Sequence, residues 1–193
     1  MIYTDFSKAF NRIHHGLLLR KLTNIGLPND FMKWLTSYLT DRVQNVKLES
    51  SISKDITVYS GVPQGSHLGP ILFALYVNDL CNELVNCEFL FYADDLKIFK
   101  RIDNLNDVSL LQNNLLTISS WCKDNFMQLN ITKCKVITFS RKRTSNRLLC
   151  DYAINEEVIK RCTRVLLDEK VNMNEHVDNI CKKAMKIFAL VKR

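Results

Sequence analysis

Residues 91–99 read FYADDLKIF, with two adjacent aspartates, Asp94 and Asp95, set between apolar and aromatic residues. Neighbouring carboxylates repel each other, and apolar surroundings add a desolvation cost to both charges. In a regular strand the two side chains would point to opposite faces, whereas in the tight turn of a hairpin both can project from the tip. The flanking segments EFLFY (88–92) and LKIFK (96–100) therefore predict a β-hairpin that presents carboxylates.

A hairpin of this kind can hold a divalent cation, because Mg²⁺ prefers carboxylate oxygens and usually takes one or two of them together with substrate phosphates. Two ions held ~3.5–4 Å apart for phosphoryl transfer need a third carboxylate. Asp5 is the candidate, since it ends a short predicted strand, MIYTDF (1–6), that could pair beside the hairpin. The Asp94–Asp95 dipeptide alone also fits an ordinary exposed turn, in which aspartate is favoured.

The rest of the chain mixes predicted helices and strands without strict βαβ alternation. Apolar spacing predicts helices over residues 15–26, 29–39, 71–84, 107–124 and 174–191. Strand patterns cover residues 42–48, 55–60, 134–139, 147–154 and 156–167. The segment GVPQGSHLGP (61–70) is punctuated by glycine and proline and predicts a loop. Together these elements predict an α+β fold.

Charge is distributed unevenly along the 193 residues, whose formal net charge is +7. Residues 1–100 carry ten basic and ten acidic side chains, whereas residues 101–193 carry seventeen basic and ten acidic ones. The densest basic run is SRKRTSNR (140–147). Such a surface can bind a polyanion such as nucleic acid, and it also fits a solvated loop rich in lysine and arginine.

Cysteine spacing and hydropathy exclude several classes of protein. The seven cysteines form no CxxC pair, so we interpret them as reduced thiols, mostly in the core, rather than as zinc ligands or a disulfide framework. No apolar run reaches transmembrane length, and the N-terminus lacks the pattern of a signal peptide. The sequence therefore predicts an intracellular protein without a membrane partner, in the nucleus or the cytoplasm.

Four segments occur in a fixed order: DFSKAF (5–10), SGVPQGSHLGPILFALYVNDL (60–80), FYADD (91–95) and LNITKCKVITFS (129–140). Together they closely resemble the reverse transcriptases of non-LTR (LINE-type, jockey-like) retrotransposons. The resemblance continues through the final segment, NEHVDNICKKAMKIFALVKR (174–193). It implies a reverse-transcriptase palm, an α+β fold in which helices pack on one face of an antiparallel sheet, with a partial fingers insertion.

The resemblance also implies roles for individual residues. Asp5, Asp94 and Asp95 match the catalytic aspartates that bind metal. Lys133 matches the basic residue that neutralises or protonates the departing pyrophosphate, although it would equally fit a solvated charge. The residues implied to bind the nucleotide are Phe6, Phe10, Gly61, Pro63, Gln64 and Gly65. Phe10 would exclude a 2′-hydroxyl from the sugar site, and its alternative is an ordinary core phenylalanine.

The implied chemistry is nucleotidyl transfer to a primer 3′-hydroxyl, with two Mg²⁺ (or Mn²⁺) ions as cofactors. The implied partners are an RNA template, a DNA primer and deoxynucleoside triphosphates. Within a single reverse transcriptase domain fragment (1–193), residues 1–12 and 61–165 are expected to form the palm and residues 13–60 part of the fingers. Residues 166–193 are expected to begin the connection or thumb.

Two further hypotheses of a different class stay open. Met1 precedes Asp5 by four residues, so most of the fingers would be missing, and Asn11 stands where the family usually has aspartate. The chain could then be a truncated, catalytically inactive relic that keeps the fold and binds nucleic acid. A plain RNA-binding module would instead show salt-dependent binding that does not depend on Asp5 or Asp94.

Overall fold

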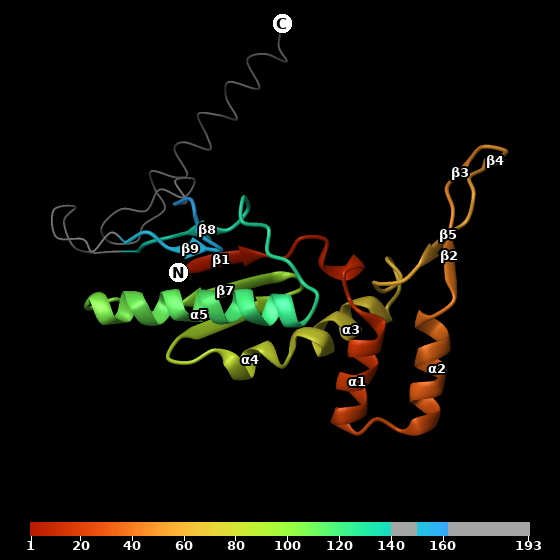
Figure 1. Cartoon of the computed structure of the whole chain (residues 1–193), viewed down its shortest axis with the longest axis horizontal. Coiled ribbons are helices and arrows are strands. Elements are labelled where there is room, and N and C mark those ends of the chain that lie inside the picture. Colours follow the sequence, from red (N-terminus) through yellow and green to blue (C-terminus); the bar gives the residue numbers. More distant parts are fainter. Residues whose placement is uncertain (140–149, 162–193) are drawn as a thin grey trace, which may run out of the picture.

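The computed structural model describes residues 1–139 and 150–161. Four predicted features fall wholly or partly outside these residues: the basic run 140–147, the start of the strand 147–154, the end of the strand 156–167, and the last helix, 174–191. The described part has a central sheet and a projecting unit of two helices and a long hairpin (Figure 1). The predicted mixture of helices and strands is therefore confirmed.

The central sheet has four antiparallel strands in the order β6-β7-β1-β8. Its bounds are β1 Ile2–Asp5, β6 Glu88–Tyr92, β7 Asp95–Phe99 and β8 Lys135–Val136. Because β1 pairs with β7, the N-terminal strand lies directly beside the carboxylate hairpin, as the sequence predicted. A separate two-stranded sheet joins β9 (Ala153–Ile154) to β10 (Glu157–Val158).

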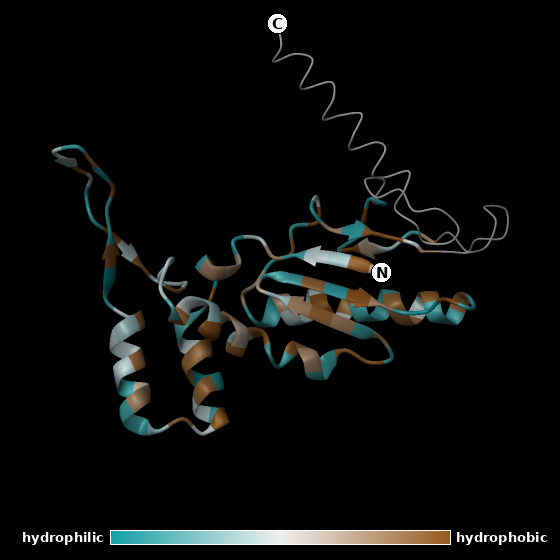
Figure 2. Ribbon diagram, turned by 180° about the vertical axis from the view of Figure 1, so that it is seen from behind, coloured by the Kyte–Doolittle hydropathy of each residue, from teal (hydrophilic) through white to brown (hydrophobic). Residues whose placement is uncertain are grey.

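One face of the central sheet packs into the hydrophobic core, and no helix of residues 1–139 and 150–161 covers the opposite face, which we call the open face. Alternate residues on the core side, such as Ile2, Leu96 and Ile98, are fully buried. Helix α5 (Leu105–Asp124) lies across this face, in front of the sheet in Figure 1 and behind it in Figure 2. Its predicted apolar stripe is buried at Leu111, Leu115, Ile118 and Trp121. The expected antiparallel sheet with helices on one face is confirmed.

Capping explains where α5 begins. Asn104 accepts a hydrogen bond from the Asp107 backbone, and the Asp107 carboxylate accepts one from the Asn104 backbone, so the two residues form a capping box. The helix therefore starts two residues before the predicted position, at Leu105.

The projecting unit begins with two helices, α1 (His15–Ile25) and α2 (Asn29–Leu39). Gly26 ends α1 in the left-handed conformation (φ 90°), and Pro28 precedes α2. A long hairpin follows, in which β2 (Arg42–Gln44) pairs with β5 (Ile56–Val58), and β3 (Lys47–Leu48) pairs with β4 (Ser51–Ile52) nearer the tip. Figure 1 shows this hairpin extending away from the sheet. The predicted strand pair around a Ser-rich turn is confirmed.

The single helix predicted over 71–84 is wrong in two respects. It begins earlier, as α3 (Leu68–Val77), because Pro70 fits the first turn of a helix. It is also interrupted before α4 (Leu80–Glu83). The interruption follows from backbone bonds that span three residues, from Cys81 N–H to Asn78 O (3.2 Å) and from Asn82 N–H to Asp79 O (3.0 Å).

A charged junction joins α1 to the helices that follow the loop. Lys21 Nζ lies 2.8 Å from Asp79 Oδ2 and donates a 2.7 Å hydrogen bond to the Tyr76 carbonyl. It also lies 4.6 Å from the Tyr76 ring centroid and 4.9 Å from that of Trp121. Desolvation lowers the pKa of Lys21, and the hydrogen bond to Asp79 opposes this effect. The junction therefore fixes α1 against the core.

We expect Lys21→Met to lower the free energy of unfolding by about 1–3 kcal/mol, because it leaves the half-exposed Asp79 without its cation. Chemical denaturation monitored by circular dichroism measures this. Lys33→Met is the matched control, because Lys33 and Asp30 form an ion pair whose side chains are 79% and 96% exposed. It should change the free energy by no more than about 0.5 kcal/mol. Equal effects of the two substitutions would contradict a role for the junction.

The described residues include five free cysteines and no helix that could span a membrane. Cys122 and Cys134 are buried free thiols, and burial raises the pKa of Cys122 to about 12. Cys81, Cys87 and Cys150 are free and partly exposed. Among the helices that the structure describes, none has both the length and the apolar character needed to cross a membrane.

Candidate active site

The hairpin that carries the two adjacent aspartates has a two-residue turn. Tyr92 and Asp95 are cross-strand partners, so Ala93 and Asp94 form the turn between them. Ala93 has a φ of 52°, and a positive φ is what the first central position of a type I′ or II′ turn requires. Asp94 therefore lies at the tip, whereas Asp95 is the first residue of β7. The expectation that both aspartates project from the tip holds for Asp94 only.

Asp95 lies directly opposite Asp5 in the register of β1 and β7. Directly opposed residues of antiparallel strands point to the same face, and two like charges at such positions destabilise the pair. Both carboxylates therefore share the open face of the sheet. The register therefore places Asp95, and not the adjacent Asp94, opposite Asp5.

Asp5 is buried, and Lys133 is its charged neighbour. The residue is 6% exposed, and its Oδ2 atom makes no hydrogen bond within the described part of the chain. Lys133 Nζ lies 3.3 Å from that oxygen as an ion pair. The lysine reaches it because the Asn130 N–H donates a 2.7 Å hydrogen bond to the Asp5 carbonyl and anchors the turn that follows. The structure thus brings Lys133 to the predicted site.

Asp95 has a different partner, Tyr3, which is not among the residues predicted for the site. The Tyr3 hydroxyl donates a hydrogen bond to Asp95 Oδ1. This bond raises the pKa of Tyr3, and burial and the charge of Asp95 add to the effect. The sequence does contain a feature that could have indicated Tyr3: it precedes Asp5 by two positions, so both side chains lie on one face of a strand.

A divalent cation would fit this arrangement. Within residues 1–139 and 150–161, no group of three His, Cys, Asp or Glu side chains is placed to hold a metal ion. Two carboxylates nevertheless face each other across β1 and β7, and one of them has a buried oxygen without a hydrogen bond. Since Mg²⁺ usually takes one or two carboxylates and completes its shell with substrate phosphates and water, Asp5 and Asp95 suit it.

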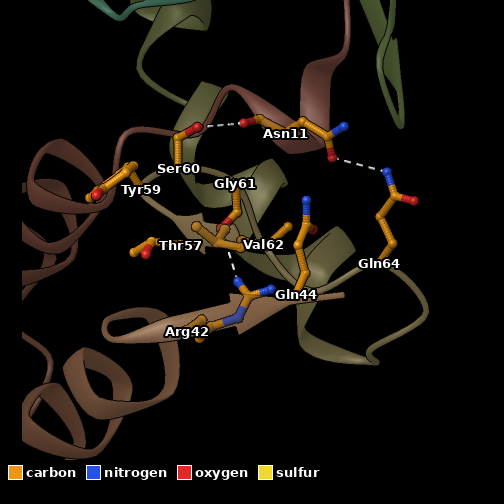
Figure 3. A pocket seen from close by; sticks show the side chains of 10 residues that line it. Asn11, Arg42, Gln44, Thr57, Tyr59, Ser60, Gly61, Val62 and Gln64 are labelled. Atoms are coloured by element: carbon orange, nitrogen blue, oxygen red, sulfur yellow. Dashed lines mark hydrogen bonds between the residues drawn. The ribbon is translucent and has the colours of Figure 1, made fainter. Parts of the chain in front are cut away.

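The glycine-rich loop packs tightly against the 3₁₀ helix η1 (Ala9–Asn11). The Gly61 N–H donates to Ile13 O at 2.8 Å, and the Val62 N–H donates to Phe10 O at 3.0 Å. In Figure 3, the Gln64 side chain points toward Asn11, and its Nε2 donates a 2.9 Å hydrogen bond to Asn11 Oδ1. Asn11 therefore orients Gln64.

This loop also borders a cavity of about 480 Å³ between η1 and the base of the long hairpin (Figure 3). Arg42 lies on its wall and extends toward the Gly61 carbonyl, which is 3.4 Å from Arg42 Nη1. Of the residues predicted to bind the nucleotide, Gly61 and Gln64 line the cavity. Pro63 and Gly65 belong to the same loop but not to the lining.

The two predicted phenylalanines differ in exposure. Phe6 is 2% exposed, and its ring packs edge-on against Phe73 and Trp121 at centroid distances of 6.4 and 6.5 Å. Phe10 is half-buried, and its ring centroid lies 4.9 Å from that of Phe73. The Phe6 side chain thus belongs to the core, whereas Phe10 is a partly buried residue that packs against the core.

Residues 1–176 match the protein family described as reverse transcriptase (RNA-dependent DNA polymerase). The chain belongs to the reverse transcriptase family. It is 31% identical over 152 residues to the probable RNA-directed DNA polymerase from transposon BS of Drosophila melanogaster, a match that covers 75% of this chain and 17% of that protein. It is 27% identical over 192 residues to the RNA-directed DNA polymerase from mobile element jockey of the same species, covering 92% and 20% of the two chains.

A structural likeness supports the same fold. Apo telomerase from Candida tropicalis, truncated from its C-terminal domain, matches 69% of this reverse transcriptase chain with a TM-score of 0.54 and 17% sequence identity. The match covers 29% of the telomerase chain. The predicted membership among reverse transcriptases of non-LTR retrotransposons and the predicted palm-type α+β fold are both confirmed. The chain spans 17% and 20% of the length of the two transposon polymerases.

Proposed function

We propose that this chain is the catalytic part of an RNA-directed DNA polymerase that adds deoxynucleotides to a primer 3′-hydroxyl. The observation that carries the proposal is the cross-strand pair of Asp5 and Asp95 on the open face of the sheet, with Lys133 Nζ 3.3 Å from Asp5. In this proposal residues 1–12 and 61–165 form the palm, and residues 13–60 form part of the fingers. The partners are an RNA template, a DNA primer and deoxynucleoside triphosphates.

Asp5 and Asp95, with Asp94 at the neighbouring tip, are the residues that would hold two divalent cations. Bound Mg²⁺ or Mn²⁺ lowers the pKa of an attacking hydroxyl and stabilises charge on the triphosphate. Lys133 is 64% exposed on its side chain, so its ammonium group can turn from Asp5 to the departing pyrophosphate, which it would neutralise or protonate.

The remaining residues of the site would position the nucleotide. Gln64 offers both a donor and an acceptor beside the cavity, and Asn11 fixes its orientation. Phe10 lies in η1 and is only partly buried, and its bulky ring would exclude a 2′-hydroxyl. Arg42 would contribute a positive charge on the cavity wall for a phosphate of the nucleic acid.

An inactive relic is the alternative, and it is not favoured. The Asp5–Asp95 pair and the neighbouring Lys133 are all present and lie together, as catalysis would require. The substitution of asparagine at position 11 also leaves the pair intact, since Asn11 lies in η1 and bonds to Gln64 instead.

A primer-extension assay tests the proposed function. The full chain, incubated with a DNA primer on an RNA template and deoxynucleoside triphosphates, should extend the primer in the presence of Mg²⁺ or Mn²⁺. Removing the cation with EDTA should abolish extension, because the carboxylate pair then lacks its counter-charge. A reaction without template is the control. Absence of extension with both cations, from a chain shown to be folded, would overturn the proposal and support the relic.

A further inference from the structure

Tyr3 lies in the middle of β1, with Lys97 of β7 and Lys135 of β8 as its cross-strand partners. Its side chain is on the open face, where Asp5 follows two residues later. The hydroxyl crosses diagonally to Asp95, the residue opposite Asp5. Tyr3 therefore connects the strand of one carboxylate to the side chain of the other.

The two carboxylates of the pair are held by separate groups. Asp5 contacts Lys133 at 3.3 Å, whereas no ion pair to Asp95 is found in the part of the chain that the structure describes. The hydrogen bond from Tyr3 is thus the contact that fixes the Asp95 side chain. Asp95 directly follows a two-residue turn. Without the hydrogen bond from Tyr3, its side chain could rotate toward solvent or toward Lys97 on the same face.

Tyrosine suits this task. Its ring has few rotatable bonds and is held in a strand, so little side-chain freedom is lost when the hydroxyl donates. The hydroxyl engages Oδ1 and leaves Oδ2 of Asp95 available to a further ligand. A neutral donor also leaves the carboxylate charged, which a cation requires.

We propose that Tyr3 is a positioning residue that fixes the Asp95 carboxylate for a divalent cation held jointly with Asp5. The inference rests on the proposed function, since it assumes that this pair binds the cation. Tyr3 should therefore affect the affinity for the cation but not the binding of nucleic acid or nucleotide.

The test is a titration of the full chain with Mn²⁺ alone, in which electron paramagnetic resonance measures the free ion. Tyr3→Phe removes only the hydroxyl and should weaken Mn²⁺ binding about tenfold, as loss of a group that orients a metal ligand usually does. Tyr92→Phe is the matched control, because Tyr92 is the cross-strand partner of Asp95 and is 78% exposed. Its Mn²⁺ affinity should equal that of the wild type.

Two further measurements separate positioning from a general structural effect. In primer extension, Tyr3→Phe should raise the apparent KM for Mg²⁺ while leaving the KM for the nucleotide unchanged. In the background of Asp95→Asn, Tyr3→Phe should cause no further loss of Mn²⁺ affinity, because the carboxylate that it orients is absent. Thermal unfolding of each variant shows whether the fold is retained.

The outcomes distinguish this inference from the proposed function. If Asp5→Asn weakens Mn²⁺ binding but Tyr3→Phe does not, the role of Tyr3 is refuted and the cation site stands. If the wild-type chain binds no Mn²⁺, both the cation site and the role of Tyr3 are refuted. Additive losses in the double variant would show that Tyr3 acts on the fold as a whole and not through Asp95.

Discussion

Replacing Asp5 by asparagine is expected to abolish primer extension while the chain stays folded. Asparagine has the shape of aspartate but no charge, so the cation loses a ligand and Lys133 loses its ionic partner. Stabilisation by a metal ion contributes several kcal/mol to a phosphoryl-transfer transition state, and a loss of about 4 kcal/mol corresponds to a rate lower by about a thousandfold. Single-nucleotide incorporation on an RNA template measures this rate.

Asp94→Asn should have a comparable effect if the residue at the hairpin tip supplies a further cation ligand. Asp124→Asn, at an exposed position at the end of α5, is the control and should leave the rate unchanged. Full activity in Asp5→Asn would refute the proposed catalytic pair. If the chain only bound RNA, Asp5→Asn and Asp94→Asn would both bind RNA with the affinity and the salt dependence of the wild type.

Gly61→Ala is expected to destabilise the fold by about 3 kcal/mol or more. Gly61 has a φ of 84°, in the left-handed region that alanine adopts only at a cost. A Cβ atom there would lie 2.7 Å from Asn11 Cα and 2.9 Å from the carbonyl oxygens of Asn11 and Phe10. These are backbone atoms that cannot move aside as a flexible side chain would. The loop would therefore separate from η1.

Gly65→Ala, in the same loop, provides the comparison. Gly65 also has a positive φ, 81°, but a Cβ atom there would meet nothing within 4 Å. Only the backbone strain remains, so the free energy of unfolding should fall by about 1 kcal/mol. Denaturant titration of both variants gives the difference. Equal losses would show that the close approach of Gly61 to η1 does not contribute to stability.

Local patterns were sufficient to predict most elements of the fold. Alternating apolar residues identified β1 and the hairpin of β6 and β7, and helical spacing identified α1, α2 and α5. The interruption before Leu80 was missed, because it depends on bonds around Asn78 and Asp79 that apolar spacing does not reveal. The packing of the Phe6 ring cannot be read from local patterns either, since the ring contacts Trp121, which is distant in the sequence.

The sequence by itself determined the family and the carboxylates, because the order of four motifs and the chemistry of aspartate can be read without coordinates. Only the tertiary structure decided that Asp95 opposes Asp5, that Lys133 contacts Asp5, and that Tyr3 holds Asp95. The physical reason is strand register. If one strand shifted by one residue against its neighbour, every side chain of that strand would move to the opposite face of the sheet. The register is set by pairing between segments far apart in the chain.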